Sequence, residues 1–418
     1  MQRIAILENK RIVLGVCGSV ATYKAVMLAS RLTQAGALVD AVLTDSACRF
    51  VTPLSFSAVT GRPAYASMWH TDEDVHILHV QLGRQADLLL VAPATAHTIA
   101  RLAHGMADDL LSVTALAVRC PLVVAPAMDA GMYEHPATQA NIATLRSRGA
   151  LVVEPVEGRM ASGLTGRGRM VEPDELVGHA RRVLGLNGPL AGRRVVVTAG
   201  PTRESLDPVR FVSNWSTGKQ GVALAQAALD HGADVTLITG PTSLPMPVGA
   251  QVIAVVTVEE MLGAVLSQVE GADVLVMAAA PVDHRPEHVA EQKIKKGGDL
   301  TIRLTPTADI LKQVRQMKRT RGWPKVTVGF AAETENVVEN ARIKLEQKGL
   351  DLIVANDVTV EGSGFGYDTN RVTLLDYQGG FASLPLMSKV DAAEAIMKRV
   401  EVILHDRDQP GVYAPLEE

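Results

Sequence analysis

Two hydrophobic patterns alternate along the first half of the chain. Short continuous apolar runs at residues 11–18 and 37–44 are bounded by Gly or Pro, and residues 20–34 between them have the spacing of a helix. Similar runs follow at residues 86–95 and 120–128. Continuous apolar runs separated by helices are typical of parallel strands buried on both faces. The first half is therefore predicted to be a doubly wound α/β domain.

The same alternation restarts after a short segment, "GLNGPLAG" at residues 185–192, whose Gly, Pro and Asn content is typical of a linker. The expected elements of the second half are strands at 193–202, 232–240, 272–282, 325–334 and 350–358, helices at 218–231 and from about Ser388, and a hairpin at 371–386. We therefore predict two domains, residues 1–188 and 189–418, each with a mostly parallel sheet. Their likeness reflects a shared architecture rather than a recent duplication.

Composition supports this division and narrows the classes of function. A chain of 418 residues is too long for one hydrophobic core. Hydrophobic residues make up 47% and charged residues 21%, which is typical of a globular protein. The net charge is −4 without blocks of like charge, so neither nucleic acid nor a membrane surface is an expected partner. No apolar run approaches the roughly 18 residues of a membrane span.

Cysteine and histidine positions argue against a disulfide framework and a metal site. Cys17, Cys48 and Cys120 are far apart, which favours a reducing, cytoplasmic location. The N-terminus lacks the apolar core of a signal peptide. His76 and His79 have a spacing that suits metal ligands, but no third ligand is nearby, so we discount a metal there.

Several loops of the first half are suited to a phosphate and a flat ring. Gly18 and Ser19 stand at a strand-to-helix turn, where backbone N–H groups favour an anion. The turn lacks GxGxxG spacing, which favours a mononucleotide over a dinucleotide. Loops of small residues at 92–98 and 125–136 follow buried strands and would allow a ring to approach the backbone. The stretch "GRMASGLTGRGRM", residues 158–170, holds four Gly and three Arg and is predicted to be a loop that closes over an anion.

Four stretches of this half, "CGSVATYKA", "ADLLLVAPATAHTIARLAHGMADDLLS", "APAMDAGMYEHPATQANIATLRSRG" and "EGRMASGLTGRGRM", resemble the phosphopantothenoylcysteine decarboxylase half of a bifunctional coenzyme A biosynthesis family. The resemblance implies a flavodoxin-like fold, oxidation of the cysteine thiol end of the substrate by FMN, loss of carbon dioxide and reduction of the enethiol. It implies His79 as the catalytic base. The implied FMN-binding residues are Gly18, Ser19, Thr44, Ser46, Pro93, Ala94, Thr95 and Ser112.

Two positions depart from that family's pattern. Asp129 stands where the family has an Asn that holds the substrate carboxylate, and Ser162 stands where it has the Cys that donates a proton to the enethiol. Two carboxylates about 4 Å apart repel by roughly 4 kcal/mol at an effective dielectric constant near 20. We therefore expect Asp129 to be protonated when substrate binds, or not to touch the carboxylate, with Arg159 and Arg167 available to neutralise the charge. A protonated Asp129 could supply the proton, because a hydroxyl is a far weaker acid than a thiol.

The second half opens with "VTAGPTRESLDPVRFVSNWSTGKQG", residues 197–221. Ser216, Thr217 and Gly218 open a predicted helix and provide a second anion cradle, without the spacing of a P-loop. Two later groups of lysines are Lys293, Lys295 and Lys296, and then Lys344 and Lys348. Such groups are usually solvated, and they bind a triphosphate only if the fold brings them to a cleft.

These stretches, with "KIKK", "GFAAET" and "LDLIVANDV", resemble the phosphopantothenate–cysteine ligase half of the same family. The resemblance implies that CTP, with Mg²⁺, activates phosphopantothenate as an acyl-cytidylate, which Asn214 handles before cysteine displaces CMP. Lys293 is the implied catalytic lysine. The implied CTP-binding residues are Met277, Ala278, Ala279, Asp283, Lys293, Ala308, Asp309, Ile310, Leu311, Phe330, Lys344 and Lys348. The family's "AVADYR" reads "APVDHR" here, and Asp283 is retained.

Two alternatives to a fully bifunctional enzyme remain from the sequence. One is a working ligase fused to a flavin-binding regulatory or catalytically altered module, because Asp129 and Ser162 depart from the pattern. The other is a peptide-cysteine decarboxylase, which leaves the second half unexplained. The resemblance also implies a homo-oligomer, with flavin domains in trimers or higher multiples and ligase domains in dimers.

Overall fold

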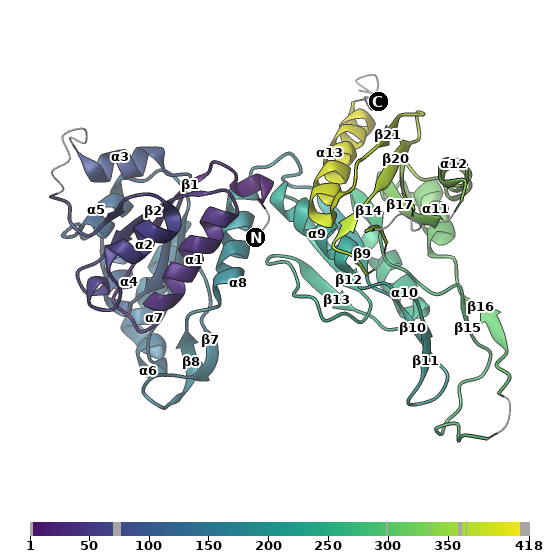
Figure 1. The fold of residues 1–418 in the computed structure, drawn as a ribbon, viewed down its shortest axis with the longest axis horizontal. Helices are drawn as coiled ribbons and strands as arrows, with labels where there is room; N and C mark the ends of the chain where they lie inside the picture. The colour runs from purple at the N-terminus through teal and green to yellow at the C-terminus, as the bar shows by residue number, and fades with distance from the viewer. Residues whose placement is uncertain are drawn as a thin grey trace. The chain divides into compact units, whose positions relative to one another are not determined.

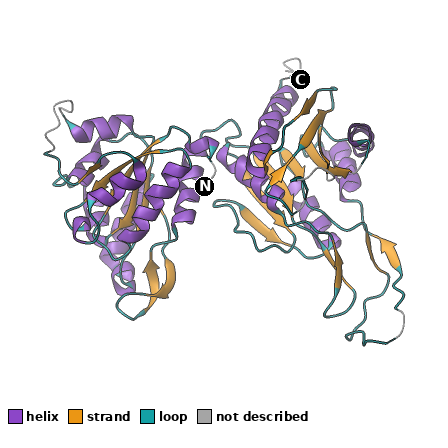
Figure 2. Ribbon diagram, in the orientation of Figure 1, coloured by secondary structure: helices purple, strands orange, loops and turns teal. Residues whose placement is uncertain are grey.

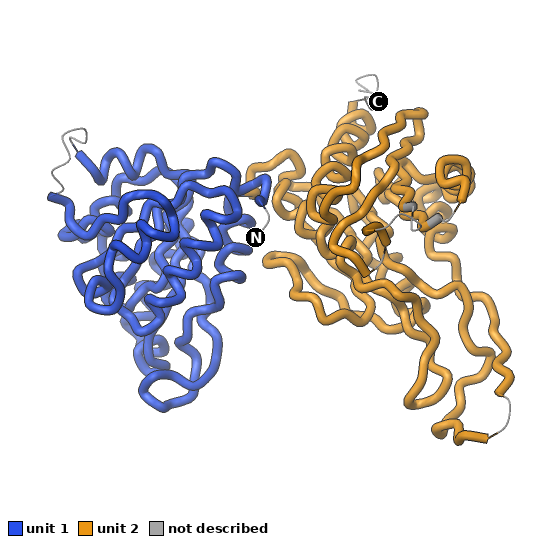
Figure 3. Tube along the Cα trace, in the orientation of Figure 1, with its two compact units in different colours: residues 1–184 blue, residues 185–418 orange. Residues whose placement is uncertain are grey.

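The computed structural model describes residues 3–69, 77–297, 300–333, 335–357, 362–364 and 366–409. It divides into two compact units, residues 1–184 and 185–418, coloured separately in Figure 3. Helices and strands alternate through both units, as Figure 2 shows. Within the described residues, every helix is too short or too polar to span a bilayer.

The first unit is built on one parallel sheet with the strand order β3-β2-β1-β4-β5-β6. Its strands are β1 (Arg11–Val16), β2 (Leu38–Leu43), β3 (Ala64–Tyr65), β4 (Leu88–Ala94), β5 (Leu122–Pro126) and β6 (Leu151–Val152). Its α-helices are α1 (Thr22–Gln34), α2 (Pro53–Thr60), α3 (Leu78–Gln85), α4 (Ala96–His104), α5 (Leu110–Ala117), α6 (Ala130–Glu134), α7 (Pro136–Ser147) and α8 (Pro173–Gly185). The order reverses between β1 and β4, which is the switch point where ligands bind in such sheets.

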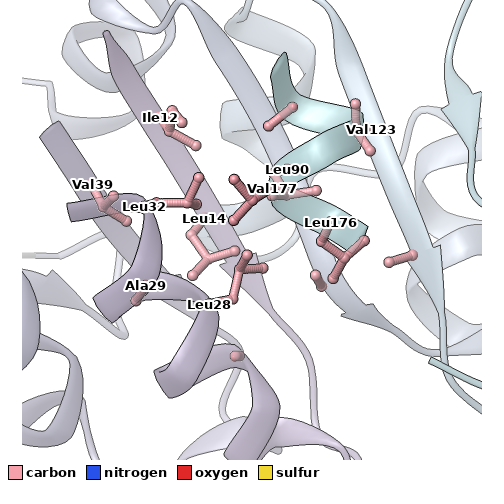
Figure 4. Packing of buried hydrophobic residues seen from close by; sticks show 14 of the residues in the cluster. Ile12, Leu14, Leu28, Ala29, Leu32, Val39, Leu90, Val123, Leu176 and Val177 are labelled. Carbon is pink, nitrogen blue, oxygen red and sulfur yellow. The ribbon is translucent and has the colours of Figure 1, made fainter. Parts of the chain in front are cut away.

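Both faces of this sheet are covered because its strands are apolar on both sides. Alternate residues of β1 point to opposite faces: Leu14 packs with α1 and α8, whereas Val13 packs with α3, α4 and α5. Figure 4 shows Leu14 and Leu90 of the sheet beside Leu28 of α1 and Leu176 of α8. The predicted continuous apolar strands are thus confirmed, and the two layers of helices hold the carboxyl ends of the strands at one edge.

A hairpin extends from the first unit between β6 and α8 (Figure 1). Its strands are β7 (Val156–Arg159) and β8 (Thr165–Arg169), and they pair antiparallel. The prediction of an irregular loop at residues 158–170 was therefore wrong. We call this hairpin, residues 156–169, the flap.

The second unit has an eight-stranded sheet in the order β13-β12-β9-β14-β17-β18-β20-β21. Its strands are β9 (Arg194–Ala199), β12 (Asp234–Thr239), β13 (Gln251–Ala254), β14 (Val274–Met277), β17 (Val326–Glu333), β18 (Leu352–Asp357), β20 (Val372–Asp376) and β21 (Phe381–Ser383). The strands from β13 to β18 are parallel, and β20 and β21 add antiparallel. The predicted hairpin at 371–386 is the pair β20–β21.

Helices cover both faces of the second sheet as well. α9 (Lys219–Asp230) and α13 (Lys389–Asp408) pack on one face, and α10 (Val258–Val269) and α11 (Ile310–Arg321) pack on the other. α12 (Val337–Lys348) packs near β18 and β20. Among the described residues, three small two-stranded sheets complete this unit: β10 (Arg203–Ser205) with β11 (Phe211–Ser213), β15 (His284–Pro286) with β16 (Leu304–Pro306), and β19 (Thr369–Asn370) with β22 (Met387–Ser388).

Candidate functional site

The turn after β1 lies at the switch point of the first sheet and is held by hydrogen bonds within it. The Ser19 N–H and the Thr22 hydroxyl are 3.4 Å apart, and the Ser19 hydroxyl accepts from the Ala21 N–H at 3.2 Å. A side chain on Gly18 would place its Cβ 2.8 Å from the Ser46 carbonyl oxygen. Only glycine therefore allows these two predicted flavin-binding loops to approach each other.

The remaining predicted flavin-binding residues lie on neighbouring elements of the same edge. Thr44 follows β2, and its N–H donates to Val16 at 3.0 Å. Pro93 and Ala94 end β4, and the Pro93 carbonyl accepts from the Cys17 N–H at 3.2 Å. Thr95 caps α4 through the Thr98 N–H at 3.3 Å. Ser112 is buried in the first turn of α5. Gly18, Ser19 and Ser46 share this edge with them, so the structure brings together the ends of β1, β2 and β4.

A pocket of about 290 Å³ lies between the turn at Ser19, the loop after β5 and the flap. Asp129 and Ser162 both line it, and the Ser162 hydroxyl donates to Asp129 Oδ2 at 2.7 Å. Asp129 also caps α6 by accepting from the Gly131 N–H at 3.2 Å. The two residues that depart from the family's pattern are thus direct partners. Arg159 lines the pocket as well, whereas Arg167 lies within 4.0 Å of Glu154 outside it.

Glycines allow the flap to lie against the Asp129 loop. A Cβ on Gly168 would be 2.2 Å from the Met128 carbonyl oxygen, and one on Gly166 would be 2.7 Å from Ala130 Cβ. The Met128 N–H donates to the Gly168 carbonyl at 3.0 Å and fixes this approach. The glycines of the flap therefore allow its backbone to pack closely against the Asp129 loop. Composition alone does not distinguish such a packed hairpin from an irregular loop.

Lys24 is a pocket residue that the sequence did not single out. It lies on α1, only 6% exposed, and its ammonium donates to the Met170 carbonyl at 3.0 Å and to Glu172 at 2.7 Å. These bonds join α1 to the segment that follows the flap. The sequence signal that could have identified Lys24 is its position on the buried face of a predicted helix.

His79 is not brought to this pocket within one chain. It lies half-buried near the start of α3, and α3 and the flap lie at opposite ends of the first unit (Figure 1). Among the described residues, those lining the pocket do not include His79. His76 falls outside the described residues.

The switch point of the second sheet, between β9 and β14, gathers four loops. The Ala279 N–H donates to the Thr198 hydroxyl at 3.1 Å, and the Ala280 N–H donates to the Gly200 carbonyl at 2.9 Å. The Asn214 amide donates to the carbonyls of Ala280 and Pro281, each at 3.1 Å. Asn214 is therefore fixed at the carboxyl end of β14, beside Ala278 and Ala279.

The residues of the predicted second anion cradle lie at the start of α9. Gly218 is its N-cap with φ of 83°, and a Cβ there would lie 3.3 Å from the Gly200 nitrogen. The Thr242 hydroxyl donates to the Thr217 carbonyl at 3.0 Å. The first turn of α9 thus directs its N–H groups toward the switch point, where they favour an anion.

The predicted CTP-binding segments after β14 and before α11 lie side by side. The Thr307 N–H donates to the Asp283 carbonyl at 2.9 Å, which places Ala308–Leu311 beside the β14 loop. Asp309 caps α11 through the Lys312 N–H at 3.0 Å and pairs with Lys348 at the end of α12. Burial raises the pKa of Asp309, but its bonds to Lys348 and Lys312 outweigh this and hold the pKa below its usual value.

The other predicted CTP-binding residues are distributed over three elements. Met277 is buried at the end of β14, where the Thr198 hydroxyl lies 3.7 Å from its sulfur. Phe330 lies half-buried on β17, next to β14 in the sheet. Lys344 lies exposed on α12, one turn before Lys348.

Lys293 lies exposed in the segment between β15 and β16, which we call the lysine arm, residues 287–297. Two residues that the sequence did not single out hold this arm. Asp207 accepts from the Ile294 N–H at 3.1 Å, and the Arg210 guanidinium donates to the Ile294 carbonyl at 3.1 Å. The motif "LDPVR" contained both, but their partner lies 87 residues away from Asp207 in sequence.

The two units are therefore two α/β domains, each with a switch point of the kind at which ligands bind in such sheets. The flavoprotein family matches residues 5–185, and the DNA/pantothenate metabolism flavoprotein C-terminal domain family matches residues 190–403. The coenzyme A biosynthesis bifunctional protein CoaBC of Bacillus subtilis is 45% identical over 95% of this chain and 98% of that protein. Its counterpart from Vibrio cholerae is 46% identical over 94% of this chain and 98% of that protein. A crystal structure of the C-terminal domain of a CoaBC protein is 39% identical over 53% of this chain and all of that chain, with a TM-score of 0.45.

The chain belongs to the family of bifunctional coenzyme A biosynthesis proteins. It is a decarboxylase and ligase that performs two steps of this pathway, and its cofactor is a flavin. The predicted family is thus confirmed, and a ligase fused to a purely regulatory flavin module is not favoured.

Proposed function

We propose that residues 189–418 join cysteine to 4'-phosphopantothenate with CTP, and that residues 1–188 decarboxylate the product with FMN to 4'-phosphopantetheine. The observation that carries this proposal is that each unit has its own sheet with its own switch point, and a strand-to-helix turn with glycine lies at each, Gly18–Ser19 in one and Gly218 in the other.

The end of β1 supports FMN as the flavin. The Ser19 turn precedes α1 at the switch point, where a helix N-terminus favours a phosphate, and only glycine at position 18 allows this turn to lie against Ser46. When bound, FMN would supply the redox chemistry at the cysteine end of the substrate. We expect the purified protein to be yellow, with FMN released on denaturation, and a colourless protein that fails to take up FMN would refute this assignment.

We place the proton-donating role at the pocket on Asp129, which lies 2.7 Å from the Ser162 hydroxyl of the flap. The hydroxyl that bonds Asp129 also keeps the carboxyl directed toward the flap. If Asp129 is protonated in the substrate complex, it can deliver a proton to the enethiol, and Arg159 at the pocket wall can neutralise the substrate carboxylate. This assigns the acid to Asp129 and a supporting hydrogen bond to Ser162.

The separation of His79 from the flap supports a homo-oligomer. His79 does not line the pocket that Asp129 lines, so we propose that a second copy supplies the base to this site. We expect chains with His79→Ala and Asp129→Ala to be inactive as decarboxylases separately. Mixed assemblies should regain activity, because some sites then hold one intact copy of each residue, and no recovery after co-expression would refute the shared site.

The second unit supports a nucleotide with several phosphates. Asn214 is fixed at the switch point, and Lys348 pairs with Asp309 at the start of α11, one turn after Lys344 on α12. Lys293 is carried by the lysine arm. Cations and Mg²⁺ stabilise charge at the attacked phosphate. Among the described residues, no group of three or more His, Cys, Asp and Glu side chains could hold a metal ion, so we expect Mg²⁺ to be held largely by the nucleotide's own phosphates.

One experiment tests the whole proposal. Purified protein is incubated with phosphopantothenate, cysteine and CTP, and the products are resolved by mass. We expect phosphopantothenoylcysteine to form first and phosphopantetheine to follow. Accumulation of the first product alone would mean that the decarboxylase half is inactive, and equal use of ATP would refute the choice of CTP. A cytoplasmic location follows from these metabolites and is tested by fractionation.

A further inference from the structure

The lysine arm is attached to the tip of the β10–β11 hairpin rather than to the main sheet. The Ala290 N–H donates to the Leu206 carbonyl at 3.0 Å, and both backbone polar groups of Ile294 bond the side chains of Asp207 and Arg210. Ile294 stands directly between Lys293 and Lys295 in the sequence. The hairpin tip therefore fixes the backbone on which these two lysines are carried.

Asp207 is the centre of this attachment. It is 2% exposed and accepts from the N–H groups of Val209 at 2.8 Å, Arg210 at 2.9 Å and Ile294 at 3.1 Å. Its second contact with Arg210 is an ion pair at 3.2 Å. Burial alone would raise the pKa of Asp207, but these N–H groups and Arg210 lower it below its usual value. The carboxylate is thus held charged, and a charged acceptor binds N–H groups more strongly than a neutral one.

The base of the same hairpin is attached to the switch point. Arg203 of β10 pairs with Ser213 of β11, and the Ser213 hydroxyl donates to the Thr202 carbonyl at 2.7 Å. Asn214 follows directly and bonds the β14 loop. One short hairpin therefore connects Asn214 at its base with the lysine arm at its tip.

We propose that Asp207 is a positioning residue for the ligase reaction, which sets the place of Lys293 and Lys295 relative to Asn214 by holding Ile294. This inference rests on the proposed use of CTP by the second unit. Asp207 does not touch the nucleotide. It lowers the conformational entropy that the arm must lose when the lysines bind the phosphates.

The test compares Asp207→Asn and Asp207→Ala with Glu291→Gln. Glu291 is an exposed acid on the same arm, so its substitution removes the same charge without touching the attachment. Hydrogen exchange of the whole enzyme without nucleotide is the first measurement. We expect faster exchange in residues 287–297 for both Asp207 variants, with Asn smaller than Ala because its oxygen can still accept, and no change for Glu291→Gln. Unchanged exchange in the arm would overturn the proposal, whatever the enzyme does with CTP.

Steady-state ligation gives the second measurement. We expect the KM for CTP to rise about tenfold in Asp207→Asn, which corresponds to about 1.4 kcal/mol, with kcat changed by less than about threefold. A loss of kcat with unchanged KM would overturn the positioning role. Thermal unfolding of the same preparations checks that the second unit is folded, because decarboxylation reports only on the first unit.

A second variant removes the same hydrogen bond by changing the lysine arm instead of the hairpin. Ile294→Pro removes the N–H that Asp207 accepts and leaves the hairpin unchanged. Its effect on KM and that of Asp207→Asn should be less than additive in the double variant, because both break one interaction. Full additivity would contradict the proposal. If the unaltered enzyme does not use CTP at all, the proposed function fails, whereas the exchange measurement still decides whether Asp207 holds the arm.

Discussion

The two units use a hairpin beside the switch point in different ways. In the first unit the flap is joined to its site by an exposed pair, Ser162 on Asp129, and by close backbone packing at Gly168. In the second unit the β10–β11 hairpin is joined to the lysine arm by Asp207, a buried carboxylate with three N–H partners. The chemistry of the first hairpin lies in solvent-accessible side chains, whereas that of the second depends on a buried polar centre.

This difference determines what a substitution does. An exposed hydrogen bond contributes little to stability, because water replaces the lost partner. A buried charged group that loses its partner keeps the cost of desolvation. Changes at the flap should therefore alter chemistry without altering the fold, and changes at buried centres of the second unit should alter structure first.

The largest effect should come from Lys293→Ala, which keeps the arm attached and removes one cation. We expect ligation to fall about 10²–10³-fold, the usual loss when one group that stabilises transition-state charge is removed. The assay is CMP release with phosphopantothenate and cysteine. Decarboxylation by the same chain is the internal control and should not change. A ligase rate close to that of the parent would show that Lys293 is only a surface residue.

Asp129→Asn tests the chemistry of the flap. If Asp129 is the acid, this variant should still release carbon dioxide but should stop before the final reduction, leaving reduced flavin and an oxidised enethiol product. Product mass and flavin absorbance under anaerobic conditions measure both. Adding Ser162→Cys should restore turnover, because the pair then matches the family's usual residues.

Two outcomes would contradict this assignment. An Asp129→Asn variant as active as the parent would mean that Asp129 is not the acid. A parent enzyme that releases no carbon dioxide would mean that the first unit binds flavin without decarboxylating.

His231 provides a buried charge in the second unit whose effect depends on pH. Burial lowers the pKa of His231, but hydrogen bonds and charges from Glu394 and Glu401 outweigh it and raise the pKa to about 9. A raised pKa contributes stability that is complete below about pH 6.5 and is lost as the pH rises through 9. We expect unfolding of the second unit to become easier over this interval, by on the order of 1–2 kcal/mol after solvent screening.

The measurement is thermal unfolding at several pH values for the parent, His231→Gln and His405→Gln. His405 is exposed on α13 and serves as the matched control. The pH dependence between 6.5 and 9 should be smaller in His231→Gln and unchanged in His405→Gln. An identical slope in all three proteins would show that His231 does not carry the charge.

The smallest effect should come from Ser162→Ala. Its hydroxyl is only a hydrogen-bond donor to Asp129, a contribution of roughly 0.5–1.5 kcal/mol. Turnover should fall less than about tenfold, and the melting temperature should not change. A complete loss of decarboxylation would identify Ser162, rather than Asp129, as essential to the proton transfer.

Much of the fold could be predicted because buried parallel strands have a distinctive apolar pattern. The helix expected at 218–231 is observed as α9, Lys219–Asp230, and the expected strand 325–334 as β17, Val326–Glu333. α1 begins at Thr22 rather than Val20, because the Thr22 hydroxyl bonds the Cys17 carbonyl and completes the preceding turn. The flap was misjudged because its strands are fixed by tertiary contacts at Gly168 rather than by β propensity.

The sequence predicted those site residues whose role follows from their own chemical group and their position in a motif. Asp129 and Ser162 were identified as neighbours in one pocket through their position in the family's motifs, and their direct contact agrees with that placement. Asp207 bonds Ile294 and Lys24 bonds Met170, and both partners are distant in the sequence. A local sequence pattern does not predict such pairs. The roles of the predicted site residues stay predictions until the variants are assayed.

Gly166 and Gly168 have a consequence for how such an enzyme can evolve. Any side chain at Gly168 would collide with the Met128 carbonyl, so descendants are confined to glycine there or must move the whole hairpin. Positions 129 and 162 carry no comparable constraint, because both side chains reach solvent and neither supports the core. A lineage can therefore change these two pocket residues one step at a time, through folded intermediates, while the backbone that carries them stays the same.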